Sequence, residues 1–226
     1  MCLKLLLQSH SEPKVISYAG MLDQSGFKQW YTYQKLRAHY QYTPGEVSFL
    51  IGKPPFYFED YTMLSSGAKL TLEDIHVLAD LFRGPWPQQL DFHKDEDFGV
   101  FEKRIIRVTQ TEGDQKIQSR ITIPWVLKRK EKHNDLTLSE EKRLVTTEEA
   151  NEIRRQIEKA LNALIRHRFF CSGRPPLAVY HEMEERCQWS PYLRPAYVKD
   201  VLYQQIGSSN LSLKTVNGQL YFQESK

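Results

Sequence analysis

An Asn-Gly pair near the end of the chain is the sequence feature that most constrains its fold. Asn217 and Gly218 separate two short runs of strand-forming residues within 211–221. Both residue types accept the positive φ angles of a two-residue hairpin turn, and the pair is the strongest short-range signal for a β-hairpin. We therefore expect a β-hairpin over 211–221.

Three helices are predicted directly before this hairpin. The first opens at Thr147-Glu148-Glu149 and continues to about His167, and a Gly-Arg-Pro-Pro turn at 173–176 follows it. The second and third are expected over 177–187 and 195–206. Apolar residues at helical spacing mark the faces that these helices bury: Ile153, Ile157, Leu161, Leu164 and Ile165 in the first, Val179, Tyr180 and Met183 in the second, and Tyr197, Val198, Val201 and Leu202 in the third.

The segment 28–82 also has helical spacing. One face of its first expected helix carries Trp30, Tyr33, Leu36 and Tyr40. Thr43, with Glu46 three residues later, has the capping-box pattern of a short helix that ends at Gly52. Pro54 and Pro55 then open either a further helix or a constrained turn. Thr71 caps a last helix with an apolar stripe, which consists of Ile75, Leu78, Ala79 and Phe82.

The middle of the chain predicts a second β-hairpin. Two runs rich in Ile, Val and Thr, 100–110 and 116–126, flank Glu112-Gly113-Asp114. Nine basic residues stand against four acids between 98 and 132: Lys103, Arg104, Arg107, Lys116, Arg120, Lys128, Arg129, Lys130 and Lys132. Strand alternation splits the cations of the first strand between its two faces. They serve either as phosphate contacts or as guards against edge-to-edge aggregation. The polar segment 133–146 is expected to be a loop.

Residues 34–82 resemble the helix-turn-helix of the Cro/repressor (XRE-type) family over about 50 residues. The match consists of three segments: Leu36-Arg37, the Thr-initiated run from Tyr42 to Gly52 with Glu46 in it, and the closing helix from Leu70 to Phe82. The resemblance implies a repressor fold in which the helix after the glycine reads DNA.

The segment in the place of that reading helix departs from the family. Residues 53–61 contain two prolines, several aromatic residues and the acids Glu59 and Asp60, and only Lys53 offsets the acids. Three interpretations remain open: DNA reading, an aromatic surface that binds protein, and a buried aromatic core. The residues expected in a protein-binding surface are Phe56, Tyr57, Phe58 and Tyr61.

The order helix, helix, helix, hairpin over 147–226 resembles a winged helix, in which the third helix reads DNA and the hairpin is the wing. The resemblance places five residues near DNA: Arg174, Arg194, Tyr197, Lys199 and Lys214. The alternative is that they are ordinary solvated charges, since neighbouring acids nearly balance them. The overall layout also resembles a group of bacterial proteins, notably from Bacteroidota, that share the Glu-Val-Ser-Phe-Leu-Ile-Gly run at 46–52.

Together these patterns predict a mainly helical α+β protein with an N-terminal helix-turn-helix, a central basic β-hairpin and a C-terminal winged-helix-like unit. We divide the chain into five parts: an unassigned leader (1–26), a repressor-like helix-turn-helix (27–84), a linker (85–97), the hairpin with its polar connection (98–146) and a winged-helix-like domain (147–226).

Several classes of protein are excluded on composition and motifs. Three cysteines without a C-x-x-C spacing argue against a disulfide framework or zinc site, and no apolar run is long enough to span a membrane. Neither phosphate-binding glycine loops nor H-E-x-x-H occur, and Cys171 with His181 has no recognised nucleophile context. We expect a cytoplasmic protein that is not an enzyme and needs no cofactor or metal.

The function expected from the sequence is that of a bacterial DNA-binding protein, a transcriptional regulator whose partner is double-stranded DNA. The candidate contacts are those of the winged helix together with cations of the central hairpin and its continuation: Lys103, Arg104, Arg107, Lys128, Arg129 and Lys130. The formal net charge of +3 does not decide the matter. The alternative is a non-enzymatic protein–protein adaptor built from degenerate helix-turn-helix units.

Overall fold

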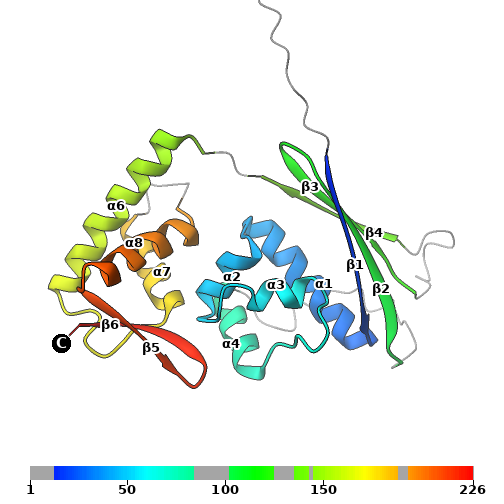
Figure 1. Ribbon diagram of the computed structural model, residues 1–226, viewed down its shortest axis with the longest axis horizontal. Helices are drawn as coiled ribbons and strands as arrows, with labels where there is room; N and C mark the ends of the chain where they lie inside the picture. The colour runs from blue at the N-terminus through cyan, green and yellow to red at the C-terminus, as the bar shows by residue number, and fades with distance from the viewer. Residues whose placement is uncertain (1–12, 84–101, 125–134, 143–144, 188–192, 226) are drawn as a thin grey trace, which may run out of the picture.

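The computed structural model describes residues 13–83, 102–124, 135–142, 145–187 and 193–225. Within these residues the chain is a mixed α and β protein with seven helices, a four-stranded antiparallel sheet and a two-stranded hairpin. The four-stranded sheet lies at one end of the molecule, helices α1 to α4 lie in the middle, and α6 to α8 with the hairpin lie at the other end (Figure 1).

The four-stranded sheet has the order β1-β2-β3-β4, with every neighbouring pair antiparallel. Its strands are β1 (Lys14–Leu22), β2 (Arg104–Glu112), β3 (Lys116–Thr122) and β4 (Asp135–Glu141). Strands β2 and β3 confirm the predicted central hairpin. The expectation of a loop over 133–146 is wrong because β4 runs through it, and the unassigned leader contains β1. The outer face of β4 is polar, with Thr137, Ser139 and Glu141, whereas β1 exposes the apolar Val15 and Met21.

The two faces of the sheet differ as strand alternation requires. Ile106 and Val108 of β2 and Ile121 of β3 point inward and are buried, whereas Arg107 and Thr109 are exposed on the outer face. This alternation confirms that the cations of β2 are split between the faces.

The middle layer consists of α1 (Gln24–Tyr40), α2 (Pro44–Leu50), α3 (Tyr57–Thr62) and α4 (Leu72–Leu81). Thr43 and Glu46 form the predicted capping box of α2, and Thr71 caps α4 together with Asp74. Trp30 of α1 is buried in the core. The helical spacing read from the sequence is therefore confirmed in this part of the chain.

The third part contains α6 (Thr147–Arg166), α7 (Pro176–Arg186), α8 (Pro195–Gly207), β5 (Leu211–Val216) and β6 (Gln219–Glu224). The three predicted helices and the hairpin are all present. Asn217 and Gly218 form the turn with φ angles of 51° and 74°, as an Asn-Gly turn requires. Arg174 forms a β-bridge with Phe222 and so extends the hairpin on its β6 side.

Elements from 27–84 and from 147–226 share one hydrophobic core. The ring of Phe49 meets that of Phe222 edge-on at 6.4 Å, and the hydroxyl of Tyr42 donates to that of Tyr180 at 3.2 Å. Gly52, with φ of 70°, ends α2, and its carbonyl accepts the backbone N–H of Leu220 at 2.9 Å. The hairpin is therefore held against the middle layer. The expected linker at 85–97 lies outside the described residues.

Candidate nucleic-acid interface

The segment expected to read DNA or bind protein in the front unit is largely part of the core. Phe58 is 0% exposed and Tyr61 8%, so both pack inside the protein. Tyr57 is half-buried, and its hydroxyl donates to Asp74 Oδ2 at 2.5 Å. Only Phe56, at 68%, presents its ring to solvent. The interpretation of a buried aromatic core therefore holds for Phe58 and Tyr61, which cannot serve as surface anchors.

The single cation of this segment is also occupied within the protein. Lys53 Nζ lies 3.1 Å from Oδ1 of Asp74, whose side chain is completely buried. Burial alone would raise the pKa of Asp74, but hydrogen bonds from Tyr57, Thr71 and Lys53 together lower it. Asp74 is thus an ionised structural group that pairs with Lys53 and keeps it from contacting a phosphate. Glu59 and Asp60 add negative charge to the same segment, 53–61. This surface is poorly suited to DNA.

Arg194 begins α8 but points toward the middle layer. Its guanidinium binds the Glu46 carboxylate through Nε at 2.9 Å and Nη2 at 2.5 Å, and Nη2 also donates to the Gln41 carbonyl at 3.1 Å. The side chains of Arg194 and Glu46 are 18% and 5% exposed. The backbone N–H of Ala196 donates to the same carboxylate at 3.3 Å. Arg194 is therefore a clamp between α8 and α2, which removes it from the set of expected phosphate contacts.

The solvent side of α8 exposes Tyr203 and Gln204, and Lys199 near them is half-buried. Tyr203 lies four positions after Lys199 and so shares its stripe of the helix, and Gln204 is the next residue round the helix. Lys199 Nζ lies 6.0 Å from the centre of the Tyr203 ring, and it has no ion pair among the described residues. Sequence reasoning missed Tyr203 and Gln204, although the four-residue spacing of Tyr203 from Lys199 on the predicted helix was a usable signal.

The remaining expected contacts near α8 differ in availability. Lys214 is exposed on β5 of the hairpin. Tyr197 is covered by the Arg154 guanidinium at 4.9 Å, and Arg154 also pairs with Asp200 at 3.4 Å. Arg174 stacks on Phe169 at 4.6 Å and donates through Nε to the Phe169 carbonyl. Tyr197 and Arg174 therefore contribute to packing.

The hairpin lies beside α8. The Tyr203 ring meets Phe222 of β6 edge-on at 6.3 Å, so α8 packs on the hairpin face of Phe222 and its partner Leu213, and the neighbouring Lys214 lies on the other face. Lys214 and Val216 of β5 are exposed. The structure thus brings together one helix face and one projecting hairpin, with two lysines that have no ion pair within the described residues.

The central cations lie at the opposite end of the molecule from α8 (Figure 1). Lys103 and Arg107 are exposed, whereas Arg104 lies on the other face and its Nη1 approaches the Pro124 carbonyl at 3.5 Å. Lys128, Arg129 and Lys130 lie outside the described residues. The structure therefore does not join the sheet cations to the α8 surface.

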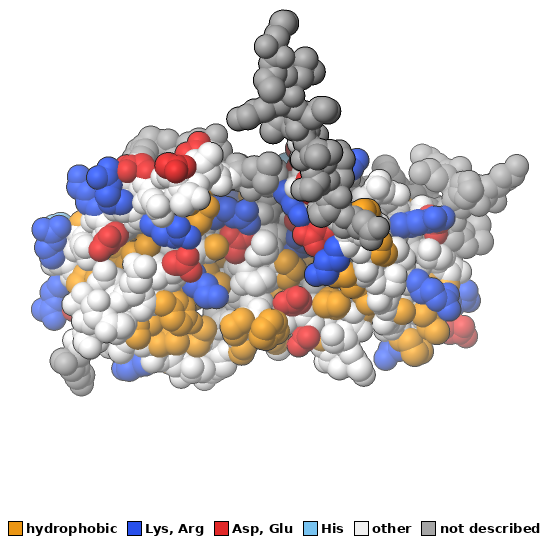
Figure 2. Space-filling view, turned by 45° about the horizontal axis from the view of Figure 1, so that its top comes forward, with side chains coloured by type: hydrophobic (Ala, Val, Ile, Leu, Met, Phe, Trp, Pro, Cys, Tyr) orange, Lys and Arg blue, Asp and Glu red, His pale blue; other side chains and the backbone are white. Residues whose placement is uncertain are grey.

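Charge on the α6 end of the molecule is mixed. Figure 2 shows Lys and Arg side chains gathered at this end with acidic side chains between them. Arg155 pairs with Glu152 on the same helix, and Arg186 pairs with Glu182 on α7. These exposed pairs neutralise one another locally, so α6 offers no continuous basic surface.

Comparison of the chain with protein-family models, curated proteins and solved structures finds no match. In the part of the chain that the structure describes, no helix has the length and apolar character to cross a membrane. The same residues include no group of three or more His, Cys, Asp or Glu side chains placed to hold a metal ion.

Proposed function

We propose that the chain binds double-stranded DNA through α8 and the β5–β6 hairpin, as a bacterial transcriptional regulator of winged-helix type. The observation that carries the proposal is a side of α8 with Tyr203 and Gln204 exposed and Lys199 half-buried, beside a hairpin that bears the exposed Lys214. A helix of this kind fits the major groove, where a lysine meets phosphates or guanine and a glutamine can bond adenine. The chain order α6-α7-α8-β5-β6 supports the same proposal.

Under this proposal the front unit positions α8 and does not read DNA itself. Glu46 of α2 binds the beginning of α8, and Gly52 binds the hairpin, so the helix-turn-helix-like unit supports both elements of the interface. Lys53, the cation of its segment 53–61, is paired with buried Asp74. The two units thus have unequal roles: one supports the contact surface and the other makes the contact.

The affinity expected from one copy of the chain is modest. Two lysines that each neutralise one phosphate give a slope of log K against log salt of about −2, since each phosphate contributes about −0.9. Non-specific binding with few phosphate contacts has a dissociation constant on the order of 10⁻⁴ to 10⁻⁶ M at physiological salt. Binding is therefore best sought at low ionic strength.

The test is a fluorescence-anisotropy titration of a random-sequence duplex at several salt concentrations. Replacing Lys199 and Lys214 together by Ala should weaken binding and reduce the salt slope by about 2. The matched control replaces Lys69 and Lys116, two exposed lysines away from α8, and should leave binding unchanged. No binding by the unmodified chain at low salt would contradict the proposal, and loss of binding in the control alone would move the interface elsewhere.

A protein-binding role is the second candidate because Phe56 and Leu72 of the front unit are each 68% exposed. Large apolar side chains at the surface are typical anchors in protein interfaces. As an adaptor, the chain would retain a protein partner in a pull-down after nuclease treatment, and Phe56→Ala would release that partner. Under the DNA-binding proposal Phe56→Ala leaves duplex binding unchanged, so the two candidates separate on one variant.

A further inference from the structure

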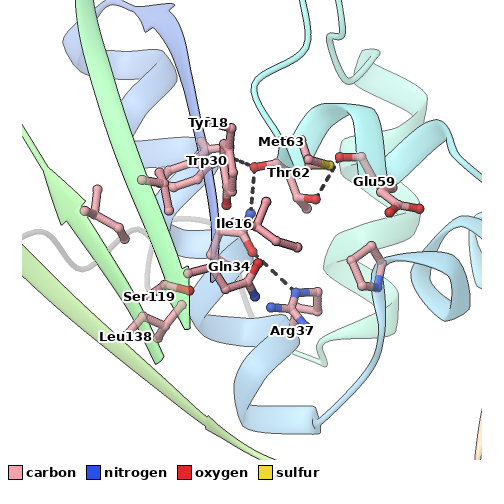
Figure 3. A pocket seen from close by; sticks show the side chains of 14 residues that line it. Ile16, Tyr18, Trp30, Gln34, Arg37, Glu59, Thr62, Met63, Ser119 and Leu138 are labelled. Atoms are coloured by element: carbon pink, nitrogen blue, oxygen red, sulfur yellow. Dashed lines mark hydrogen bonds between the residues drawn. The ribbon is translucent and has the colours of Figure 1, made fainter. Parts of the chain in front are cut away.

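A cavity of about 120 Å³ lies between the inner face of the four-stranded sheet and helices α1 and α3 (Figure 3). An engineered cavity of about 150 Å³ in another protein holds benzene, so a space of this size suits a molecule of roughly six non-hydrogen atoms. The cavity lies on the sheet side of α1, away from the proposed DNA-binding surface on α8 (Figure 1). The cavity has a helical wall and a sheet wall, and these differ in whether their polar side chains are hydrogen-bonded within the protein.

The helical wall is a completed hydrogen-bond network. Trp30 Nε1 and Gln34 Nε2 both donate to the Thr62 carbonyl, at 3.0 and 3.3 Å, and Arg37 Nε donates to Gln34 Oε1 at 3.3 Å. Figure 3 shows these side chains converging from α1 and α3. This wall is therefore rigid, because the position of each polar group is set by its neighbour.

The sheet wall has polar groups that make no such bonds. Gln110 of β2 and Ser119 of β3 are direct cross-strand partners on the inner face, and Tyr18 of β1 lies one row further along. The side chains of these three residues form no hydrogen bond with any described residue. Their polar atoms are not among the buried unpaired atoms of the described residues, so they remain accessible within the cavity and free to bond water or a small molecule.

The charges around the cavity restrict the kind of molecule that can bind in it. Arg37 binds Glu140 through both carboxylate oxygens, at 2.9 and 2.7 Å, and the two side chains are nearly buried. Their charges cancel, and Figure 3 shows the Glu59 carboxylate directed away from the sheet. An ion brought into the cavity would lose its water without gaining a free counter-charge, which is unfavourable. The space therefore suits a neutral molecule.

The available groups on the sheet wall include good donors. Burial raises the pKa of Tyr18 to about 12, with Arg37 acting weakly in the other direction, so the hydroxyl keeps its proton at neutral pH. Ser119 adds a hydroxyl and Gln110 an amide. The adjoining surface is apolar, from Ile16 and Val108. A fitting molecule has one apolar edge and one or two oxygen acceptors.

We infer that this cavity is a binding site for a neutral, ring-sized molecule whose carbonyl or hydroxyl oxygen accepts hydrogen bonds from Tyr18, Ser119 and Gln110. The site is separate from the α8 surface, and it stands whether or not the chain binds DNA. Its ligand class is represented by 2-pyridone, a six-membered ring with one carbonyl oxygen, and benzene is a control of the same size that lacks the oxygen.

The experiment is a titration of the isotope-labelled full chain with 2-pyridone and with benzene, followed in ¹⁵N–¹H spectra. The amides of Gln110 and Ser119 and the indole N–H of Trp30 report on the cavity. We expect saturable shifts of these signals with a dissociation constant below 1 mM for 2-pyridone, on the order of tenfold tighter than for benzene. Tyr18→Phe and Ser119→Ala should each weaken 2-pyridone binding at least about fivefold and leave benzene binding unchanged.

The matched control is Ser139→Ala, the same substitution on the exposed outer face of β4. It should leave 2-pyridone binding unchanged. Three results would overturn the inference: no shift of the cavity signals at 20 mM 2-pyridone, equal affinity for 2-pyridone and benzene, or equal binding by Ser119→Ala and Ser139→Ala. The first of these would mean that ordered water alone satisfies the sheet wall. None of them bears on duplex binding, which is measured separately.

Discussion

Replacing Arg194 by Ala is expected to destabilise the protein far more than the loss of an exposed charge would. The substitution removes three hydrogen bonds and leaves the Glu46 carboxylate, only 5% exposed, without its counter-charge. Removing one partner of a buried ion pair costs about 3–5 kcal/mol. Glu46 keeps the backbone N–H groups of Thr43 and Ala196, at 2.8 and 3.3 Å. The loss should therefore lie at the lower end, about 3 kcal/mol.

The assay is urea denaturation followed by circular dichroism and tryptophan fluorescence. In a thermal melt of the same variants, a loss of about 3 kcal/mol corresponds to a fall in Tm of about 6–12 °C for a chain of this length. Arg155→Ala is the matched control, because Arg155 is 77% exposed and, among the described residues, pairs with Glu152 on its own helix. Its loss should stay below about 0.5 kcal/mol. Arg194→Lys keeps the charge without the bidentate geometry and should fall between the two.

The reasoning would be refuted by an Arg194→Ala variant that loses less than about 1 kcal/mol, since that would mean that α8 and α2 are not clamped by this pair. A double-mutant cycle with Glu46→Gln sharpens the result. If the clamp holds, the double variant is less destabilised than the sum of the single variants, because the second substitution removes the stranded partner. Additive losses would show that Arg194 and Glu46 act independently.

Three further predictions concern other positions. Because folding lowers the pKa of Asp74, the ionised carboxylate contributes its full stability above the unfolded pKa of about 3.9, and this contribution is lost as the pH falls through the lower folded pKa. In urea titrations, the difference in unfolding free energy between the parent and Asp74→Asn should therefore shrink below about pH 4. Gly52→Ala should destabilise the protein by about 1–2 kcal/mol, because Gly52 has φ of 70° and an added Cβ would lie 3.2 Å from Leu220 N. The control, Gly45→Ala, adds its Cβ in open space and should not destabilise. Equal thermal midpoints for the two variants would contradict this prediction. Tyr180→Phe should cost about 1 kcal/mol by leaving the buried Tyr42 hydroxyl without its acceptor, and adding Tyr42→Phe should cost little more in the same denaturation assay.

The features that sequence reasoning predicted well are local in the chain. The capping box of Thr43 and Glu46 and the Asn217-Gly218 turn join residues no more than three positions apart, so their patterns are visible without knowledge of the fold. The helical stripes of α6, α7 and α8 are local in the same sense. Such elements could be placed from periodicity and caps alone.

The features that escaped prediction depend on partners far away in sequence. One missed feature, β4, is an exception: Leu136 and Leu138 alternate with Thr137 and Ser139, a short strand pattern that the sequence did contain, and the nearby β3 supplies the hydrogen-bonding edge. Arg194 looked like a phosphate contact at the start of a helix, but Glu46, its partner, is 148 positions away. The side chains of Phe58 and Tyr61 have equal hydrophobic character whether buried or exposed, so only the packing decided their role.

The pairing of β1 with β2 has a consequence for how the chain is made. The two strands are hydrogen-bonded neighbours, yet about eighty residues, which include helices α1 to α4, separate Leu22 from Arg104. During synthesis β1 leaves the ribosome before β2, and it has no strand to pair with until the whole middle layer has emerged. Throughout that interval Ile16, Tyr18 and Leu22 have no sheet to cover them. Completion of the sheet is therefore a late step in folding, and the waiting strand is the point at which a chaperone would be of most use.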